Sequence, residues 1–229
     1  MEEKKVVAMK KDEFTLREHI KNYLGKGKLS RVRMEYTPVG EKIIISTSRP
    51  GLIIGRGGEK IEELTNLVKR RFKLENPHIE IDEIREPDFD AQTIADEIAT
   101  NLERSGPLKF KVVSYRTLQR VVKAGALGVE IRLSGKLPGA RAKSWRFFQG
   151  YLKKVGESAN IVDRAQATAQ TKPGIVGVKV SILSPHVKLK DRIIIDEEFI
   201  KELKTQDEKL KNPVEKKIIK KKTARKKSK

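Results

Sequence analysis

The first part of the chain opens with apolar residues at helical spacing. Four of them would line one face of a helix: Leu16, Ile20, Tyr23 and Leu24. Thr15 and Glu18 have the spacing of a capping box, and Gly25 is a common helix terminator. The pattern therefore predicts a helix that begins near Thr15 and ends before Gly25.

Strand patterns follow this helix. Residues 31–36 alternate charged and apolar side chains, which is typical of a half-buried strand. Residues 42–48 form a β-branched run that indicates a more fully buried strand, and residues 38–40 supply the turn between the two.

A short helix, a glycine loop, a long helix and a strand complete the first half. Pro50 can open a helical turn that reaches Ile54, the glycines interrupt it, and residues 59–72 resume with apolar residues on one face. A strand is predicted over residues 78–84. Pro87 disfavours helix at the preceding residue and marks a domain boundary.

The second half begins with helices predicted over residues 90–104 and 107–123, each followed by a glycine. Strand candidates then cover residues 126–133, 145–154, 161–171 and 175–183. The third of these could also be helical, because it is rich in Ala and Gln. The fold class is α+β, with expected domains at 1–86 and 87–196, and with a short helix and a basic, disordered tail over 197–229.

The charge indicates a polyanionic partner. The chain has 51 Lys and Arg residues and 31 acidic residues, which gives a net charge of +20. Residues 214–229 alone contain nine basic residues and one acidic residue. There is no cysteine, which excludes disulfides and thiolate metal sites. No apolar run of about 18 residues exists, so neither a membrane span nor secretion is expected, and the cytoplasm is the default location.

One glycine-rich motif is placed to bind phosphate. Gly55, Arg56, Gly57 and Gly58 immediately precede a predicted amphipathic helix, whose amino end would present N–H groups and a partial positive charge, with Lys60 adding a cation. The spacing fits neither a P-loop nor a GxGxxG dinucleotide site. The competing interpretation is a plain glycine turn between two helices.

The motif resembles that of the KH family. Residues 54–61 match the family's IGxxGxxI pattern, and the elements before it resemble the type II variant. The resemblance implies that residues 55–58 clamp the sugar-phosphate backbone of single-stranded RNA, without catalysis.

Two blocks in the second half are similar to the uS three family of small-subunit ribosomal proteins. They are residues 125–144, which end in GARAKS, and residues 172–180. The version of these blocks here, with the lysine tail, resembles the archaeal or eukaryotic branch. The resemblance implies a structural protein that binds small-subunit rRNA, lines the path along which mRNA enters, contacts neighbouring ribosomal proteins and has no cofactor.

Basic and aromatic residues are interleaved between residues 136 and 154. Lys136, Arg141, Lys143 and Arg146 are predicted to contact RNA phosphates. For the aromatic residues among them, packing is favoured over stacking on RNA bases, and the alternation suggests Phe147, and secondarily Trp145, as core residues.

The resemblance also implies that the start of the 107–123 helix faces mRNA. Lys111 matches one member of the family's basic pair, Val112 departs from it, and Arg116 is an adjacent substitute. The helical wheel directs both cations away from the apolar face. Ordinary solvated helix charges are the alternative.

Nothing in the sequence assembles as an active site or a metal site. The histidines are scattered and no HxxxH or HExxH spacing occurs. The chain is therefore expected not to be an enzyme. Two other classes stay open: a free KH-type RNA chaperone or regulator, and a DNA lyase with a lysine nucleophile, although no lysine stands out.

Overall fold

A computed structural model describes residues 2–187, except 39, 73, 75 and 140, and also residue 189. The short helix and basic tail predicted over 197–229 lie outside the described residues. The amino-terminal half contains α1 (Glu2–Leu24), β1 (Arg31–Thr37), β2 (Gly40–Thr47), α2 (Pro50–Ile54), a 3-10 turn η1 (Arg56–Gly58), α3 (Glu59–Phe72) and β3 (His78–Glu83).

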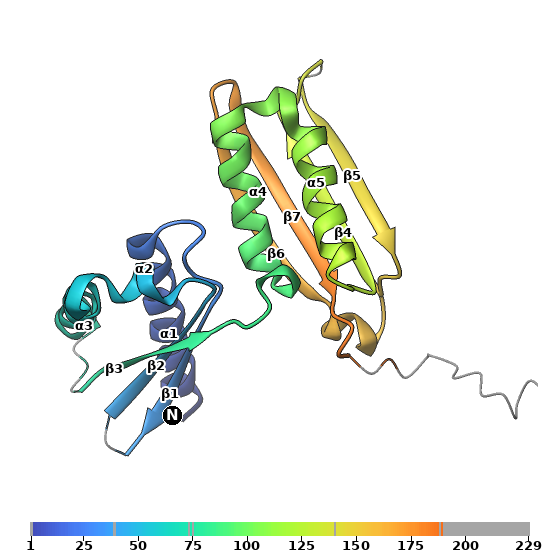
Figure 1. Cartoon of the computed structure of the whole chain (residues 1–229). Coiled ribbons are helices and arrows are strands. Elements are labelled where there is room, and N and C mark those ends of the chain that lie inside the picture. Colours follow the sequence, from blue (N-terminus) through green and yellow to red (C-terminus); the bar gives the residue numbers. More distant parts are fainter. Residues whose placement is uncertain are drawn as a thin grey trace, which may run out of the picture. The chain divides into compact units, whose positions relative to one another are not determined.

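The three strands of this half form one sheet in the order β1-β2-β3 (Figure 1). β1 pairs with β2 in antiparallel fashion, and β2 pairs with β3 in parallel. Alternate β2 residues Ile43 and Ile45 are fully buried and belong to one core with Leu64 and Val68 of α3. From the predicted apolar stripe of α1, Leu16, Ile20 and Leu24 join this core, whereas Tyr23 is 39% exposed. This core holds the glycine loop between α2 and α3.

The second half contains η2 (Pro87–Phe89), α4 (Ala91–Ser105), η3 (Pro107–Lys109), α5 (Phe110–Lys123), β4 (Gly128–Gly135), β5 (Lys143–Gly150), η4 (Glu157–Ile161), β6 (Asp163–Thr171) and β7 (Gly174–Leu183). The strands form an antiparallel sheet in the order β5-β4-β7-β6. Helices α4 and α5 both cover one face of this sheet (Figure 1).

The period-two pattern of the strands explains this layered arrangement. Val129, Ile131 and Leu133 of β4 are buried against the helices, while Arg132 between them is exposed. On the helix side, Ile94 and Ile98 of α4 are fully buried in the same core. The α+β class predicted from the sequence is confirmed.

Two local expectations are wrong and one open alternative is decided. Helix α1 begins at Glu2, and the hydroxyl of Thr15 donates to the Asp12 carbonyl within it, so Thr15 and Glu18 do not cap its start. Of the two interpretations left open for residues 161–171, the strand is confirmed for residues 163–171, because pairing with β7 outweighs the helical preference of Ala and Gln. Tyr36, expected on the buried side of β1, is 52% exposed.

Candidate nucleic-acid interface

The backbone of the glycine loop has a conformation that favours glycine. Gly55, Gly57 and Gly58 have φ angles of 73°, 62° and 87°, in the left-handed region that residues with a side chain rarely adopt. The loop connects the end of α2 with the first turn of α3. The predicted helix, loop and helix are thus confirmed as local structure.

Two of the glycines leave their surroundings open. A Cβ atom added to Gly57 or Gly58 would meet no atom within 4 Å, whereas one added to Gly55 would lie 2.8 Å from the Lys60 side chain. Gly55 is therefore needed for close packing beneath Lys60. Gly57 and Gly58 leave room for a ligand to approach the backbone.

The charges around the loop are mixed. The side chains of Arg56 and Lys60 are exposed and can attract phosphate, but Glu59 and Glu62 stand in the first turn of α3. These carboxylates interact favourably with the helix dipole and oppose an approaching anion. The loop backbone and these two cations are therefore the groups here whose charge favours an anion.

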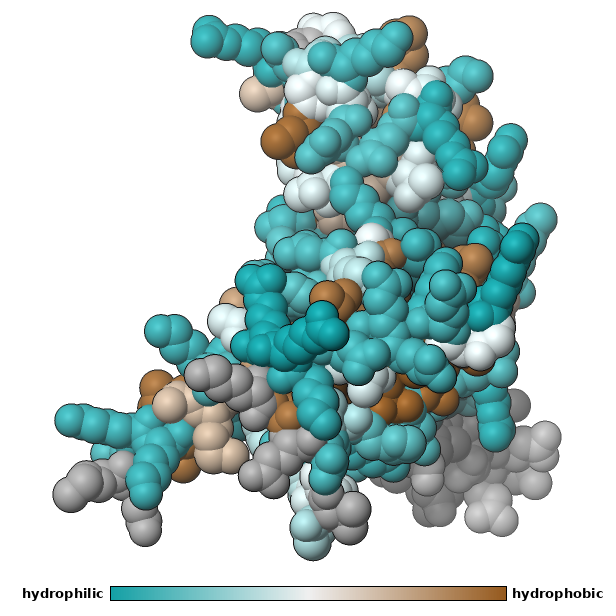
Figure 2. All heavy atoms as spheres, turned by 90° about the vertical axis from the view of Figure 1, so that its left-hand side faces the viewer, coloured by the Kyte–Doolittle hydropathy of each residue, from teal (hydrophilic) through white to brown (hydrophobic). Residues whose placement is uncertain are grey.

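Leu52 and Ile54 of α2 are the apolar residues nearest to the loop in sequence, and they are 42% and 38% exposed. On the face of the molecule drawn in Figure 2, hydrophilic residues predominate and hydrophobic ones are scattered among them. Leu52 and Ile54 are thus two exposed apolar side chains that precede the glycine loop.

A second group of predicted residues meets around Trp145 of β5. The Nζ atoms of Lys111 and Lys143 lie 4.6 Å and 4.9 Å from the centroid of the indole ring. The ring itself is half-buried, with Phe110 at 5.7 Å and Phe147 at 6.4 Å between centroids. Two lysines that are far apart in the sequence thus lie beside one aromatic ring.

The alternation of β5 separates other residues that the sequence grouped together. Trp145 and the buried Phe147 face the helices, whereas Arg146 points to the opposite face of the sheet. There Arg146 lies 3.0 Å from a carboxylate oxygen of Glu130 and 4.5 Å from the Phe148 ring centroid. The prediction that Phe147 is a core residue is confirmed.

The remaining predicted contacts are exposed but do not form one cluster. Arg116 lies on α5, and Lys136 and Arg141 lie in the connection from β4 to β5. The side chain of Lys136 runs close to Gly174. The sequence did not single out Arg132, Arg164 and Lys179, although each stands at an exposed alternate position of a strand. Strand alternation was the signal that could have identified them.

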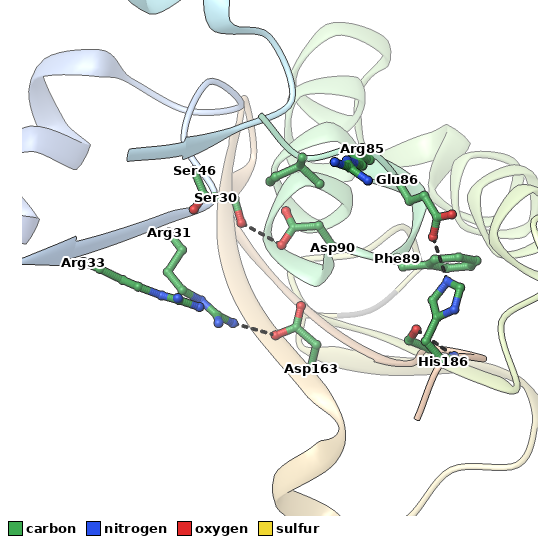
Figure 3. A pocket seen from close by; sticks show the side chains of 12 residues that line it. Ser30, Arg31, Arg33, Ser46, Arg85, Glu86, Phe89, Asp90, Asp163 and His186 are labelled. Carbon is green, nitrogen blue, oxygen red and sulfur yellow. Dashed lines mark hydrogen bonds and ion pairs between the residues drawn. The ribbon is translucent and has the colours of Figure 1, made fainter. Parts of the chain in front are cut away.

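The depression drawn in Figure 3 has a volume of about 480 Å³, and several of the side chains that line it contact one another. The Ser30 hydroxyl donates to Asp90 at 2.6 Å, Arg31 lies 3.5 Å from Asp163, and His186 lies 3.1 Å from Glu86. These groups satisfy one another. Within the described part of the chain, no group of three or more His, Cys, Asp or Glu residues could hold a metal ion.

Comparison with known proteins assigns both halves. Residues 15–89 match the family model "KH domain", and residues 98–182 match "Ribosomal protein S3, C-terminal domain". A protein of Methanocaldococcus jannaschii named small ribosomal subunit protein uS3 is 44% identical over 182 residues, which are 79% of this chain and 86% of the relative.

The chain belongs to the uS3 family. Proteins of the same name from Methanobrevibacter smithii and Methanothermobacter thermautotrophicus are 37% and 39% identical, over 78% and 76% of this chain and 71% and 67% of the relatives. RNA binding and translation follow from membership of the uS3 family, which is a ribosomal structural family and not an enzyme family. Among the described helices, none is long and apolar enough to cross a membrane.

Proposed function

We propose that this chain is a structural component of the small ribosomal subunit in the cytoplasm, where it binds rRNA and contributes to the path along which mRNA enters. The observation that carries the proposal is the succession of a KH domain and a uS3 carboxy-terminal domain along one chain. Its partners would be small-subunit rRNA, mRNA and neighbouring ribosomal proteins. The domain limits 1–86 and 87–196 belong to this proposal, supported by β3 ending at Glu83 and α4 beginning at Ala91.

The glycine loop contacts the RNA sugar-phosphate backbone in this account. Open space at Gly57 and Gly58 allows a phosphate to reach the main chain. The amino end of α3 favours negative charge there, and Arg56 and Lys60 supply mobile cations that can follow it. Since Glu59 and Glu62 oppose the anion, the loop would hold one or two phosphates and not a long strand.

The start of α5 contacts mRNA. Lys111 is exposed and lies with Lys143 beside Trp145, which supplies a pair of positive charges where Val112 interrupts the family's basic pair. Arg116 is exposed on the same helix. Lys136, Arg141 and Arg146 would provide further phosphate contacts outside this pair.

Aspartate in the glycine loop tests the first of these contacts. Gly58→Asp places a carboxylate where phosphate is expected, and a charged hydrogen bond contributes about 1.5 kcal/mol, so RNA affinity is expected to fall by about tenfold or more. The measurement is the dissociation constant for single-stranded RNA at fixed salt, because electrostatic affinity changes steeply with salt.

Gly156→Asp is the matched control. Gly156 has a φ angle of 81°, close to the 87° of Gly58, and a Cβ atom at either position would meet nothing within 4 Å. The two variants therefore add the same charge and similar backbone strain. Equal losses of affinity in both variants would contradict a specific role for the loop.

A further inference from the structure

The sheet of the second half has one face that the described helices do not cover. Helices α4 and α5 pack on the side that carries the even-numbered valines of β7 and the odd-numbered apolar residues of β4. The opposite side carries exposed residues of all four strands. We call this opposite side the open face.

A row of cations crosses the open face. Arg132 of β4 is paired in register with Arg146 of β5 on one side and with Lys179 of β7 on the other. Neighbouring strands lie about 4.8 Å apart, so three positive charges originate within about 10 Å. Arg164 of β6 and Lys154, which follows β5, add two more exposed cations.

This row is unfavourable for folding alone. Like charges that stand directly opposite one another destabilise a sheet, and opposite charges or hydroxyl pairs would stabilise it. On the strands, Glu130 is the one carboxylate of the described open face. It already contacts Arg146 at 3.0 Å and Lys154 at 2.6 Å, and Arg132 only at 4.0 Å. No described carboxylate forms an ion pair with Lys179 or Arg164.

Several other residues of the open face are suited to a polyanion. Ser134, Ser144, Ser181 and Gln166 provide hydrogen-bonding groups between the cations. The strands Gly128–Gly135, Lys143–Gly150, Asp163–Thr171 and Gly174–Leu183 place one exposed aromatic side chain on this face, Phe148, and the Arg146 guanidinium already lies over its ring. Proteins that hold single strands usually present several aromatic stacking platforms. A single platform favours contact with the backbone of a helical RNA over contact with unpaired bases.

We propose that the open face binds the sugar-phosphate backbone of duplex RNA through Arg132, Lys179, Arg164 and Arg146. Charge complementarity selects the partner, because phosphates relieve the repulsion along the cation row. A depression of about 270 Å³ lined by Arg132, Lys179, Arg164, Lys154 and Glu130 lies within this face. The glycine loop and the start of α5 are separate surfaces, so this inference stands or falls independently of them.

The experiment compares two double variants of the full chain. Arg132→Gln with Lys179→Gln removes two adjacent cations from the open face. Lys4→Gln with Lys5→Gln removes two exposed cations from α1 and serves as the control. Binding to duplex RNA is measured over a range of salt concentrations.

The open-face variant is expected to reduce the steepness of log K against log salt by about 1.8, which corresponds to about 0.9 for each of two phosphate contacts. The control should leave the slope near that of the parent. The melting temperature of the open-face variant should equal or exceed that of the parent, because the repulsion between Arg132 and Lys179 is removed.

An unchanged slope in the folded open-face variant, or the same change in the control, would overturn the proposal and leave an acidic protein surface as the better partner. If the double variant does not fold, Lys179→Gln alone must reduce the slope by about 0.9. Gly58→Asp and the open-face variant are also compared on single-stranded RNA. A loss of affinity there in Gly58→Asp alone reports on the glycine loop, so failure at the loop is distinguished from failure at the open face.

Discussion

Asp96 on α4 shows how single residues connect distant segments of the chain. Its carboxylate is buried and accepts hydrogen bonds of 3.0 Å from the Gly27 main-chain N–H and from the Gln92 side chain. Burial raises the pKa of Asp96 above its ordinary value, and these hydrogen bonds offset only part of that effect. Ionised Asp96 therefore costs stability that is recovered when it binds a proton.

The raised pKa predicts a pH dependence with a definite sign. The folded state binds the Asp96 proton more tightly than the unfolded state, so the contribution of Asp96 to the free energy of unfolding increases as pH falls through its folded pKa. The free energy of unfolding of the parent minus that of Asp96→Asn should therefore increase as pH falls from neutrality. Urea unfolding at several pH values measures it.

Glu103 on the same helix provides a control of opposite sign. Hydrogen bonds from the Gln170 main-chain N–H and from Lys26 lower the pKa of Glu103. Its stabilising effect is therefore present above the unfolded pKa and lost as pH falls through the folded one. The free energy of unfolding of the parent minus that of Glu103→Gln should decrease as pH falls. Parallel behaviour of the two variants would contradict both assignments.

Residue patterns predicted the glycine loop well because its requirements are local. A run of glycines before an amphipathic helix specifies left-handed backbone angles and an open approach, and Gly57 and Gly58 show both. The mixed charge around the loop was also visible in the sequence. The burial of Asp96 was not, since its Gly27 partner lies 69 positions away.

Among the helices and strands, α5 is the element proposed to contact mRNA. Replacing Lys111 and Arg116 by Ala removes two exposed cations while leaving the buried residues Phe110, Leu118 and Val121 in place. Ribosomes with this variant are expected to translate a message containing a stable hairpin several-fold more slowly than ribosomes with the parent chain. The reason is that the two cations would no longer hold the phosphates of the unwound mRNA strand. The measurement is the ratio of translation times for hairpin and unstructured messages.

Lys69→Ala with Arg70→Ala on α3 is the matched control, since both residues are exposed and the same charge is lost. Normal subunit assembly must be verified for each variant. If α5 and α3 variants have the same ratio as the parent, the cations of α5 are ordinary solvated charges.

A helix or strand could be predicted from the sequence where its apolar residues followed a single helical or strand spacing. The apolar stripe places α3 at Glu59–Phe72, as expected, since Leu64 and Val68 fix its buried side. Helix α1 begins earlier than predicted, and the pattern did not reveal its first half because that half has no buried apolar stripe: Val6 and Val7 are 56% and 68% exposed. β6 was ambiguous because its strand character comes from pairing with β7, which a local pattern does not contain.

At the scale of the whole molecule, the positive charge is divided among distinct surfaces. The glycine loop, the lysines around Trp145 and the open face are separate surfaces, although the last two share β5, whose side chains alternate between the two faces of the sheet. Each surface carries exposed cations. The net charge of +20 predicted a polyanionic partner but not this division. The row of Arg132, Arg146 and Lys179 depends on cross-strand register, which joins residues far apart in the sequence.

A cryo-electron microscopy map of native small subunits would show whether this chain is part of the subunit and whether its glycine loop contacts RNA. We expect density for this chain in the subunit, with RNA phosphates within hydrogen-bonding distance of the main chain at Gly57 and Gly58. A subunit that lacks the chain, or a glycine loop that faces only solvent or protein, would contradict the proposed function.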